Sequence, residues 1–363
     1  MRTMSDKRYK RLGNYIELVQ ERNKGAHITN LMGVSIAKKF IPSIANIIGT
    51  DLSTYRIVHP GNFAFCPVTS RNGEKITIAR YKGNEDCIIS QAYLPFRVID
   101  ENELDPDYLM MWVMRSEFDR YARFHSHGSV RELFSWEEMC NVYLPIPSIE
   151  EQRKIVAEYQ AVEQRIENNN RLIKALEDTA QAIYHHTFVE NIDPENLPEG
   201  WRWGTLADIA EISSGKTIND KVDNPTEEYV IPVAGATGVI GYASEANYKN
   251  KLMTTGRVGT LGVVNRYYNP IWAADNVIVV MSKYFEFTFQ ILNHLDYNEL
   301  TKLGVQSLIT KTGLENYKIV LPSDTAILEF QKKADPIAQQ IKIVSQEIDL
   351  LIKTKNLLLS KLS

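Results

Sequence analysis

Residues 144–156 read LPIPSIEEQRKIV, a junction at which an apolar run with two prolines gives way to a charged segment. Proline is tolerated at the end of a strand and in the first turn of a helix, but not in the interior of either. Ser148 suits a helix N-cap, and Glu151 stands three residues on, where a capping box places an acidic residue. The stretch therefore predicts the end of one globular domain and the start of a helix.

The segment that follows, residues 150–189, is predicted to be one long helix with a narrow apolar seam. The seam positions alternate steps of three and four residues: Ile155, Tyr159, Val162, Ile166, Asn169, Ile173, Leu176, Ala180 and Ile183. This is the heptad spacing of a coiled coil, and about 40 residues would span roughly 60 Å. The one polar seam position, Asn169, would weaken the coiled coil but fix its register.

A second, less regular copy of the junction occurs at residues 321–334, which read LPSDTAILEFQKKA. The same spacing continues through Ile327, Phe330, Ala334, Ile337, Ile341, Val344, Ile348, Leu351, Lys355, Leu358 and Leu362. Pro336 falls inside this second helix and is predicted to kink its first turns. Two helices with one seam each can bury both seams against each other within the chain, although a homodimer or a partner's helices are alternatives.

The two stretches that precede the long helices both mix short strand-like runs with a helical patch, and they match each other in places. LGNYIEL at residues 12–18 corresponds to LADIAEI at residues 206–212. Arg71-x-Gly73 is followed nine residues after the arginine by Arg80, and Arg257-x-Gly259 is followed at the same distance by Arg266. These ordered matches predict an internal duplication.

The duplication predicts an α+β chain in four parts. These parts are a first domain at residues 1–148, a long helix and linker at 149–198, a second domain at 199–322 and a C-terminal long helix at 323–363.

Composition favours a cytoplasmic protein without a membrane span. The three cysteines show no C-x-x-C spacing, no apolar run follows the basic start, and no run approaches the 18 apolar residues of a membrane span. The net charge is −4, but residues 150–200 alone hold 11 acidic and 5 basic side chains. The remainder is therefore slightly basic, which permits a nucleic-acid partner.

Familiar catalytic patterns are incomplete in this sequence. SGKT at residues 214–217 resembles the end of a P-loop, but Ala210 stands where the phosphate cradle needs its first glycine. NPIW at residues 269–272 lacks the second proline of the amino-methyltransferase motif. The histidines lack metal-ligating partners at useful spacing. No catalytic or metal site is therefore predicted.

Basic residues of the two domains point instead to DNA. The planar guanidinium group of arginine fits guanine edges and phosphates, and a glycine two residues after an arginine permits a close backbone approach. The alternative for each Arg-x-Gly is a hairpin turn with a surface arginine. The predicted DNA contacts are Arg71, Lys75, Arg80, Lys82, Lys216, Arg257 and Arg266.

The junction at residues 144–156 resembles the start of the central conserved helix of type I restriction–modification specificity subunits. Gly200-Trp201 and GATGVIGY at residues 235–242 resemble that family's second module. The resemblance implies two similar mixed α/β target recognition domains, each of which reads half of a split DNA target. It further implies that two long helices separate the domains and form an antiparallel coiled coil.

The resemblance also implies a subunit that is not itself catalytic. Two modification subunits would bring S-adenosylmethionine and methylate adenine, and restriction subunits would bring ATP and Mg²⁺ for translocation and cleavage. The coiled-coil and docking residues would be Ile155, Tyr159, Val162, Ile166, Asn169, Ile173, Leu176, Ile341, Val344, Ile348 and Leu351. The alternatives are a specificity subunit of a stand-alone methylation or type II-like restriction system, a self-contained enzyme, and a coiled-coil adaptor without DNA binding.

Overall fold

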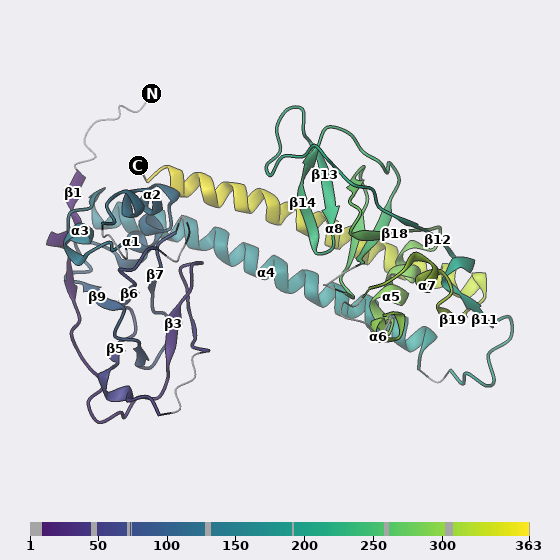
Figure 1. Cartoon of the computed structure of the whole chain (residues 1–363), viewed down its shortest axis with the longest axis horizontal. Helices are drawn as coiled ribbons and strands as arrows, with labels where there is room; N and C mark the ends of the chain where they lie inside the picture. The colour runs from purple at the N-terminus through teal and green to yellow at the C-terminus, as the bar shows by residue number, and fades with distance from the viewer. Residues whose placement is uncertain are drawn as a thin grey trace. The chain divides into compact units, whose positions relative to one another are not determined.

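The computed structural model describes residues 9–44, 49–70, 73, 75–127, 132–190, 192–257, 261–301 and 308–362. The chain forms two compact units, whose elements are labelled in Figure 1. Unit 1 contains residues 1–168 and 348–363, and unit 2 contains residues 169–347. Each unit therefore holds one domain of mixed strands and helices together with one end of each long helix.

The first domain is built on a four-stranded antiparallel sheet with strand order β2-β9-β6-β7. These strands are β2 (Ile16–Leu18), β9 (Leu94–Val98), β6 (Phe63–Phe65) and β7 (Ile78–Arg80). All three residues of β6 are buried, and the Phe63 ring stacks on Phe96 with 4.9 Å between ring centroids. Three helices contribute buried side chains to the same core as this sheet. They are α1 (Pro106–Val113), α2 (Ser116–Phe124) and α3 (Trp136–Cys140).

Short strand pairs and 3-10 helices complete the first domain. They are β3 (Met32–Val34) with β4 (Phe40–Pro42), β5 (Arg56–Val58) with β8 (Cys87–Ile89), β1 (Tyr9–Arg11) with β10 (Tyr143–Pro145), η1 (Leu12–Asn14) and η2 (Leu52–Thr54). The last strand, β10, contains the Leu144-Pro145 of the sequence junction. Because β10 pairs with β1, the first and last strands of the domain lie side by side. The long helix starts shortly after β10.

The second domain repeats this plan with a four-stranded antiparallel sheet of order β12-β18-β15-β16. Its strands are β12 (Ala210–Ser214), β18 (Val277–Ser282), β15 (Leu252–Gly256) and β16 (Val264–Tyr267). The remaining elements are β11 (Arg202–Thr205), η3 (Leu206–Asp208), β13 (Ile231–Gly235), β14 (Gly238–Ala243), β17 (Trp272–Ala273), α5 (Phe285–His294), α6 (Tyr297–Leu300), α7 (Lys311–Glu315) and β19 (Lys318–Leu321).

The predicted duplication is confirmed by the order and pairing of these elements. In each domain a first strand pairs with the last one, β1 with β10 and β11 with β19. A 3-10 helix follows the first strand, and the next strand forms one edge of a four-stranded sheet with the same chain order in both domains. The matched stretches at residues 12–18 and 206–212 are therefore equivalent in structure.

The two long helices are α4 (Ile149–Phe188) and α8 (Asp324–Ser360). Ser148 Oγ accepts a hydrogen bond from the backbone N–H of Glu151 at 3.3 Å, as the predicted N-cap requires. Ser323 Oγ accepts one from the backbone N–H of Ala326 at 3.3 Å, so the second copy of the junction is capped in the same way. Helix α8 continues through Pro336. The kink expected there stays a prediction.

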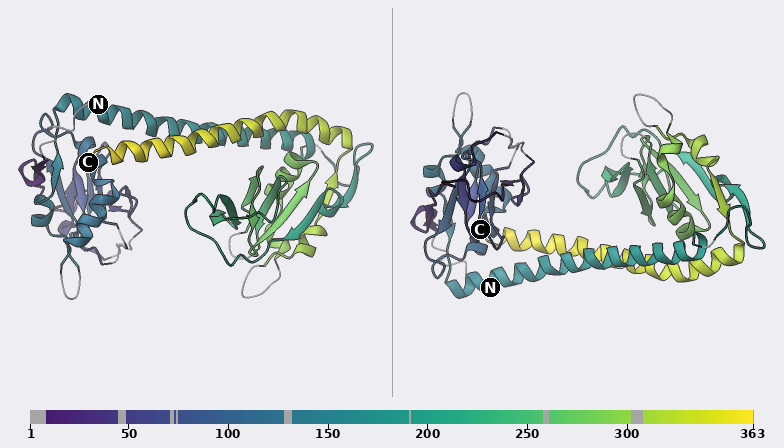
Figure 2. Two further views of the ribbon diagram at one scale, coloured as in Figure 1. Left: turned by 90° about the horizontal axis from the view of Figure 1, so that it is seen from above. Right: turned by 90° about the horizontal axis from the view of Figure 1, so that it is seen from below.

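The seams of α4 and α8 face each other in both units, and the helices run antiparallel. In unit 1, Tyr159 near the start of α4 shares a core with Leu362, just after the end of α8. In unit 2, Tyr184 near the end of α4 packs on Phe330 near the start of α8, with 5.9 Å between ring centroids. Figures 1 and 2 show the two helices side by side within each unit. The predicted antiparallel pairing within one chain is confirmed.

Candidate nucleic-acid interface

Among the described residues, no group of three or more His, Cys, Asp or Glu side chains could hold a metal ion. The P-loop-like SGKT stretch also has no phosphate cradle. Ser214 ends β12, the next residues form no helix, and Thr217 Oγ1 donates a hydrogen bond to Asp275 at 2.8 Å. A P-loop instead leads into a helix N-terminus that faces the phosphates. SGKT therefore differs from a P-loop in local structure as well as in sequence.

No helix in the described part of the chain is both long enough and apolar enough to cross a membrane.

The seven basic residues predicted to contact DNA fall into three groups. Arg71 lies outside the described residues, as does Gly259 of the second Arg-x-Gly. Lys75, Lys82 and Lys216 are exposed, and Arg257 is half-buried. Within the ranges that the structure describes, Lys216 and Arg257 have no ion-pair partner, and Lys82 Nζ lies 3.8 Å from Asp107. These side chains are available to a ligand.

The third group consists of Arg80 and Arg266, whose guanidinium groups are held inside their domains. Arg80 forms an ion pair with Asp107 at 2.7 Å, and its side chain is 18% exposed. Arg266 forms one with Glu286 at 2.9 Å, is 11% exposed, and lies over the Phe289 ring at 4.0 Å. An arginine that is half-buried and paired in this way is less available to DNA than an exposed, unpaired one. The geometry favours a structural role for both.

These two arginines occupy equivalent positions in the two sheets. In the first sheet, one row of paired residues runs Leu18, Phe96, Phe63, Arg80 across the four strands. In the second sheet, the corresponding row runs Ile212, Val280, Met253, Arg266. Asp107 and Glu286 are each the second residue of the helix that follows the sheet, α1 and α5. The ion pair is therefore part of the duplicated plan.

Both ion pairs also reach the long helix α4. In unit 1, Gln160 Nε2 donates a hydrogen bond to Asp107 at 3.2 Å. In unit 2, Glu177 lies 3.8 Å from Arg266. Each domain thus connects an edge strand of its sheet, a helix start and α4 through one polar cluster. We call these the sheet–helix clusters: Arg80, Asp107 and Gln160 in the first domain, and Arg266, Glu286 and Glu177 in the second.

Burial dominates the electrostatics of the second cluster. Desolvation raises the pKa of Glu286 above its ordinary value of 4.5, although the Arg266 charge acts in the opposite direction. Tyr268 donates a further hydrogen bond to Glu286 at 3.1 Å, and burial raises the pKa of Tyr268 as well. A carboxylate in such a site depends strongly on its arginine partner, because an unpaired buried charge is costly.

The residues predicted to form the coiled coil are buried or half-buried along both helices. They are Ile155, Tyr159, Val162, Ile166, Asn169, Ile173, Leu176, Ile341, Val344, Ile348 and Leu351. They therefore pack within their own chain. A different face of α8 exposes large apolar side chains at intervals of seven residues, and we call this set the outer stripe: Ile343, Leu350 and Leu357.

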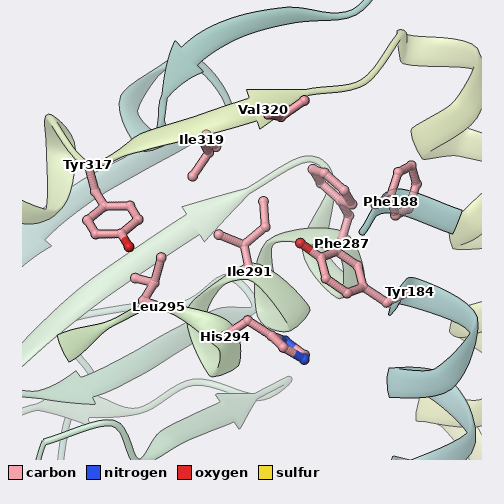
Figure 3. Close-up of a pocket in the computed structure, with 9 residues that line it drawn as sticks. All are labelled: Tyr184, Phe188, Phe287, Ile291, His294, Leu295, Tyr317, Ile319 and Val320. Atoms are coloured by element: carbon pink, nitrogen blue, oxygen red, sulfur yellow. The ribbon is translucent and has the colours of Figure 1, made fainter. Parts of the chain in front are cut away.

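Unit 2 also contains a small pocket of about 190 Å³ between α4, α5 and β19 (Figure 3). Most of its lining side chains are aromatic or aliphatic, and Tyr184, Phe188 and Phe287 line one side. Both ring nitrogens of His294 are hydrogen-bonded, Nδ1 to the Gln290 carbonyl at 2.7 Å and Nε2 to Gln181 at 3.1 Å.

Two characterised proteins are similar to this chain in sequence. The EcoprrI type I restriction enzyme specificity subunit of Escherichia coli is 26% identical over 161 residues, which cover 42% of this chain and 40% of that protein. The MjaIX type I restriction enzyme specificity subunit of Methanocaldococcus jannaschii is 21% identical over 304 residues, 73% of this chain and 70% of that protein. The chain therefore aligns with about two fifths of the first protein's length and seven tenths of the second's.

The fold is similar to that of a solved structure. The crystal structure of the type I restriction–modification system S subunit from M. genitalium matches with a TM-score of 0.59 at 14% identity, over 98% of this chain and 95% of that one. The sequence profile of the type I restriction modification DNA specificity domain matches residues 42–178 and again residues 198–358. The two matches include most of both domains and both long helices. The chain belongs to the family of type I restriction modification DNA specificity domains.

Proposed function

We propose that this chain is the DNA specificity subunit of a type I restriction–modification complex and reads a bipartite duplex target, one half with each domain. The duplicated architecture is the observation that carries the proposal. Two domains of the same strand order each lead into one of two paired long helices. Two similar readers in one chain suit a target with two separate half-sites, because each domain can read one half-site.

The DNA contacts in this proposal are the basic residues that remain available to a ligand. They are Lys75, Lys82, Lys216 and Arg257, together with Arg71. Arg80 and Arg266 are instead proposed to hold their domains together, because each is already paired with a carboxylate. Removal of an available cation should weaken DNA binding and reduce its salt dependence.

Docking of the modification subunits is proposed for the outer stripe of α8 rather than for the seam. The seam residues are covered by the other long helix, whereas Leu350 is 66% exposed and Leu357 is 55% exposed. Exposed apolar residues at seven-residue intervals can form one face of a further helix–helix contact. Restriction subunits would join the same complex.

The chain itself is proposed to be non-catalytic and cytoplasmic. S-adenosylmethionine would bind the modification subunits, and ATP and Mg²⁺ the restriction subunits. The incomplete P-loop and methyltransferase motifs support this division of labour.

The test is a footprint of the full chain, purified with its modification subunits, on genomic duplex. The expected result is protection of a bipartite sequence and adenine methylation within it when S-adenosylmethionine is present. Equal affinity for random and genomic duplex at moderate salt would refute the proposal. Turnover by the isolated chain with S-adenosylmethionine and Mg²⁺ would favour a self-contained enzyme. Complex formation without any DNA affinity would favour a coiled-coil adaptor.

A further inference from the structure

Two arginines of the first domain face each other across neighbouring strands. Arg22 follows β2, and it forms an isolated antiparallel bridge with Arg56 at the start of β5. Residues directly opposite each other on paired strands project from the same face. Two like charges in this arrangement destabilise the pair. An anion between the two side chains would relieve this repulsion.

The protein supplies no such anion among the residues that the structure describes. Neither arginine has an ion-pair partner in that part of the chain, and the Arg56 Nε atom is buried without any hydrogen-bond partner. Burial and then the charge of Arg22 lower the pKa of Arg56 from its ordinary value. The buried Nε atom cannot itself meet a phosphate, but Arg22 is exposed and Arg56 is only half-buried, so an external anion can approach the pair from solvent.

The nearest acidic side chains along these strands are already occupied. His59 Nε2 bonds to Glu21 at 2.9 Å, and His59 Nδ1 bonds to Asp86 at 2.8 Å. Glu21 is next to Arg22 in sequence, and successive side chains of an extended strand point to opposite faces. The carboxylates of this Glu21–His59–Asp86 set therefore do not neutralise the arginine pair.

The second domain has a cation at the equivalent position. Leu18 of β2 and Ile212 of β12 occupy equivalent positions in the two sheets. Leu18 begins the row of paired residues that ends in Arg80, and Ile212 begins the row that ends in Arg266. Arg22 stands four residues after Leu18, and Lys216 stands four residues after Ile212. Lys216 is exposed and has no ion-pair partner in the described ranges. A positive charge without a carboxylate partner among the described residues thus recurs four residues after the matched strand position in both domains.

We infer that Arg22 and Arg56 form a binding site for a phosphodiester group of duplex DNA in the first domain, at the place that Lys216 occupies in the second. The inference rests on the proposed function. A phosphate oxygen accepts hydrogen bonds from two arginine forks and neutralises both charges. Because the contact is to the backbone, it positions each domain on the duplex without reading its sequence.

The test measures the DNA affinity of the full chain, purified with its modification subunits, over a series of salt concentrations. The variants are Arg22→Gln, Arg56→Gln and the double variant. Each lost phosphate contact should reduce the magnitude of the slope of log K against log salt by about 0.9. Affinity should fall by the same factor for target and random duplex. Arg97→Gln is the matched control, because Arg97 is 60% exposed but paired with Glu17 at 2.7 Å.

An unchanged slope in the double variant, or one equal to that of Arg97→Gln, would overturn the inference. Loss confined to one DNA sequence would overturn the phosphate assignment in favour of base readout. The Arg22→Gln variant alone keeps the test decisive if Arg56→Gln fails to fold, because Arg22 is exposed. The proposed function fails separately, if the wild-type complex itself does not distinguish target from random duplex.

Discussion

Arg80 and Arg266 lie 186 positions apart in sequence but occupy the same place in two sheets of the same strand order, each paired with the second residue of the following helix. The same contact therefore recurs in both domains. In each, a half-buried arginine on an edge strand bonds to the first turn of the helix that follows the sheet. The further contact to α4 extends this connection to the long helix.

Substitution of Arg266 by Met should destabilise the second domain. The change leaves Glu286, which is 4% exposed, without its cation. Loss of one partner of a buried ion pair typically costs about 3 kcal/mol or more. Equilibrium urea unfolding would measure the change. The single variant should also show a further rise in the pKa of Glu286, because only the opposing charge is removed.

The control for this prediction is the double variant Arg266→Met with Glu286→Gln. Removal of both charges should recover most of the lost stability, because no unpaired carboxylate remains in the core. Arg80→Met should cost less than Arg266→Met, since the Arg80 pair is more exposed. Equal losses in the single and double variants would show that the ion pair is not the source of the effect.

The stability of the first domain should depend on pH through His59. Burial lowers the pKa of His59, but the hydrogen bonds and charges of Asp86 and Glu21 outweigh it and raise the pKa above 6.5. A raised histidine pKa adds stability that is fully present below pH 6.5 and is lost as pH rises through the folded-state pKa. The free energies of unfolding of wild type and His59→Gln, measured between about pH 6 and 8, would reveal this contribution. The same pH dependence in both proteins would contradict the role of His59.

The fold was largely predictable from the sequence because its strongest signals are periodic and repeated. The heptad steps of α4 and α8 required only the positions of apolar residues, and the predicted N-cap Ser148 marks the start of the first helix. The internal sequence duplication then indicated two similar domains. The strand order within each sheet was not predictable, because strands of three to six residues carry little information about their partners.

The predicted DNA contacts stay predictions, because the sequence shows a charge but not its partner. Arg80 and Arg266 were chosen as DNA contacts from the repeat, and the structure pairs both with carboxylates. Arg22 was not among the predicted contacts, although an extension of the match between residues 12–18 and 206–212 by four positions aligns it with Lys216. Arg56 could not have been found in this way, because its significance comes from a cross-strand contact with Arg22.

Asn169 should lower the stability of the coiled coil while it restricts the register. Its side chain is 4% exposed, and its Nδ2 atom has no hydrogen-bond partner in the described structure. Asn169→Leu should therefore raise the free energy of unfolding by about 1 kcal/mol. Thermal and urea unfolding would measure it, with Asn170→Leu as the exposed control. A less stable Asn169→Leu variant would contradict the prediction. Mixed oligomeric states in that variant would support the register role.

The outer stripe of α8 provides the sharpest test of where the modification subunits dock. Leu350→Lys places a charge at the centre of the stripe, where the side chain is 66% exposed. Because an exposed position contributes little to folding, the unfolding free energy should change by less than about 0.5 kcal/mol. A charge buried in an interface, by contrast, weakens association strongly. Co-purification and titration calorimetry should show at least a tenfold loss of affinity for the modification subunits.

The control for the stripe is Leu328→Lys, which changes another exposed leucine of α8 at a different heptad position. Leu328 is 50% exposed, so the two variants add the same charge to comparably exposed sites on one helix. The expected result is normal assembly of Leu328→Lys and loss of assembly in Leu350→Lys. Normal assembly of both would move the docking surface away from the stripe. Loss in both would show that α8 responds to added charge in general, since no single face would then account for the contact.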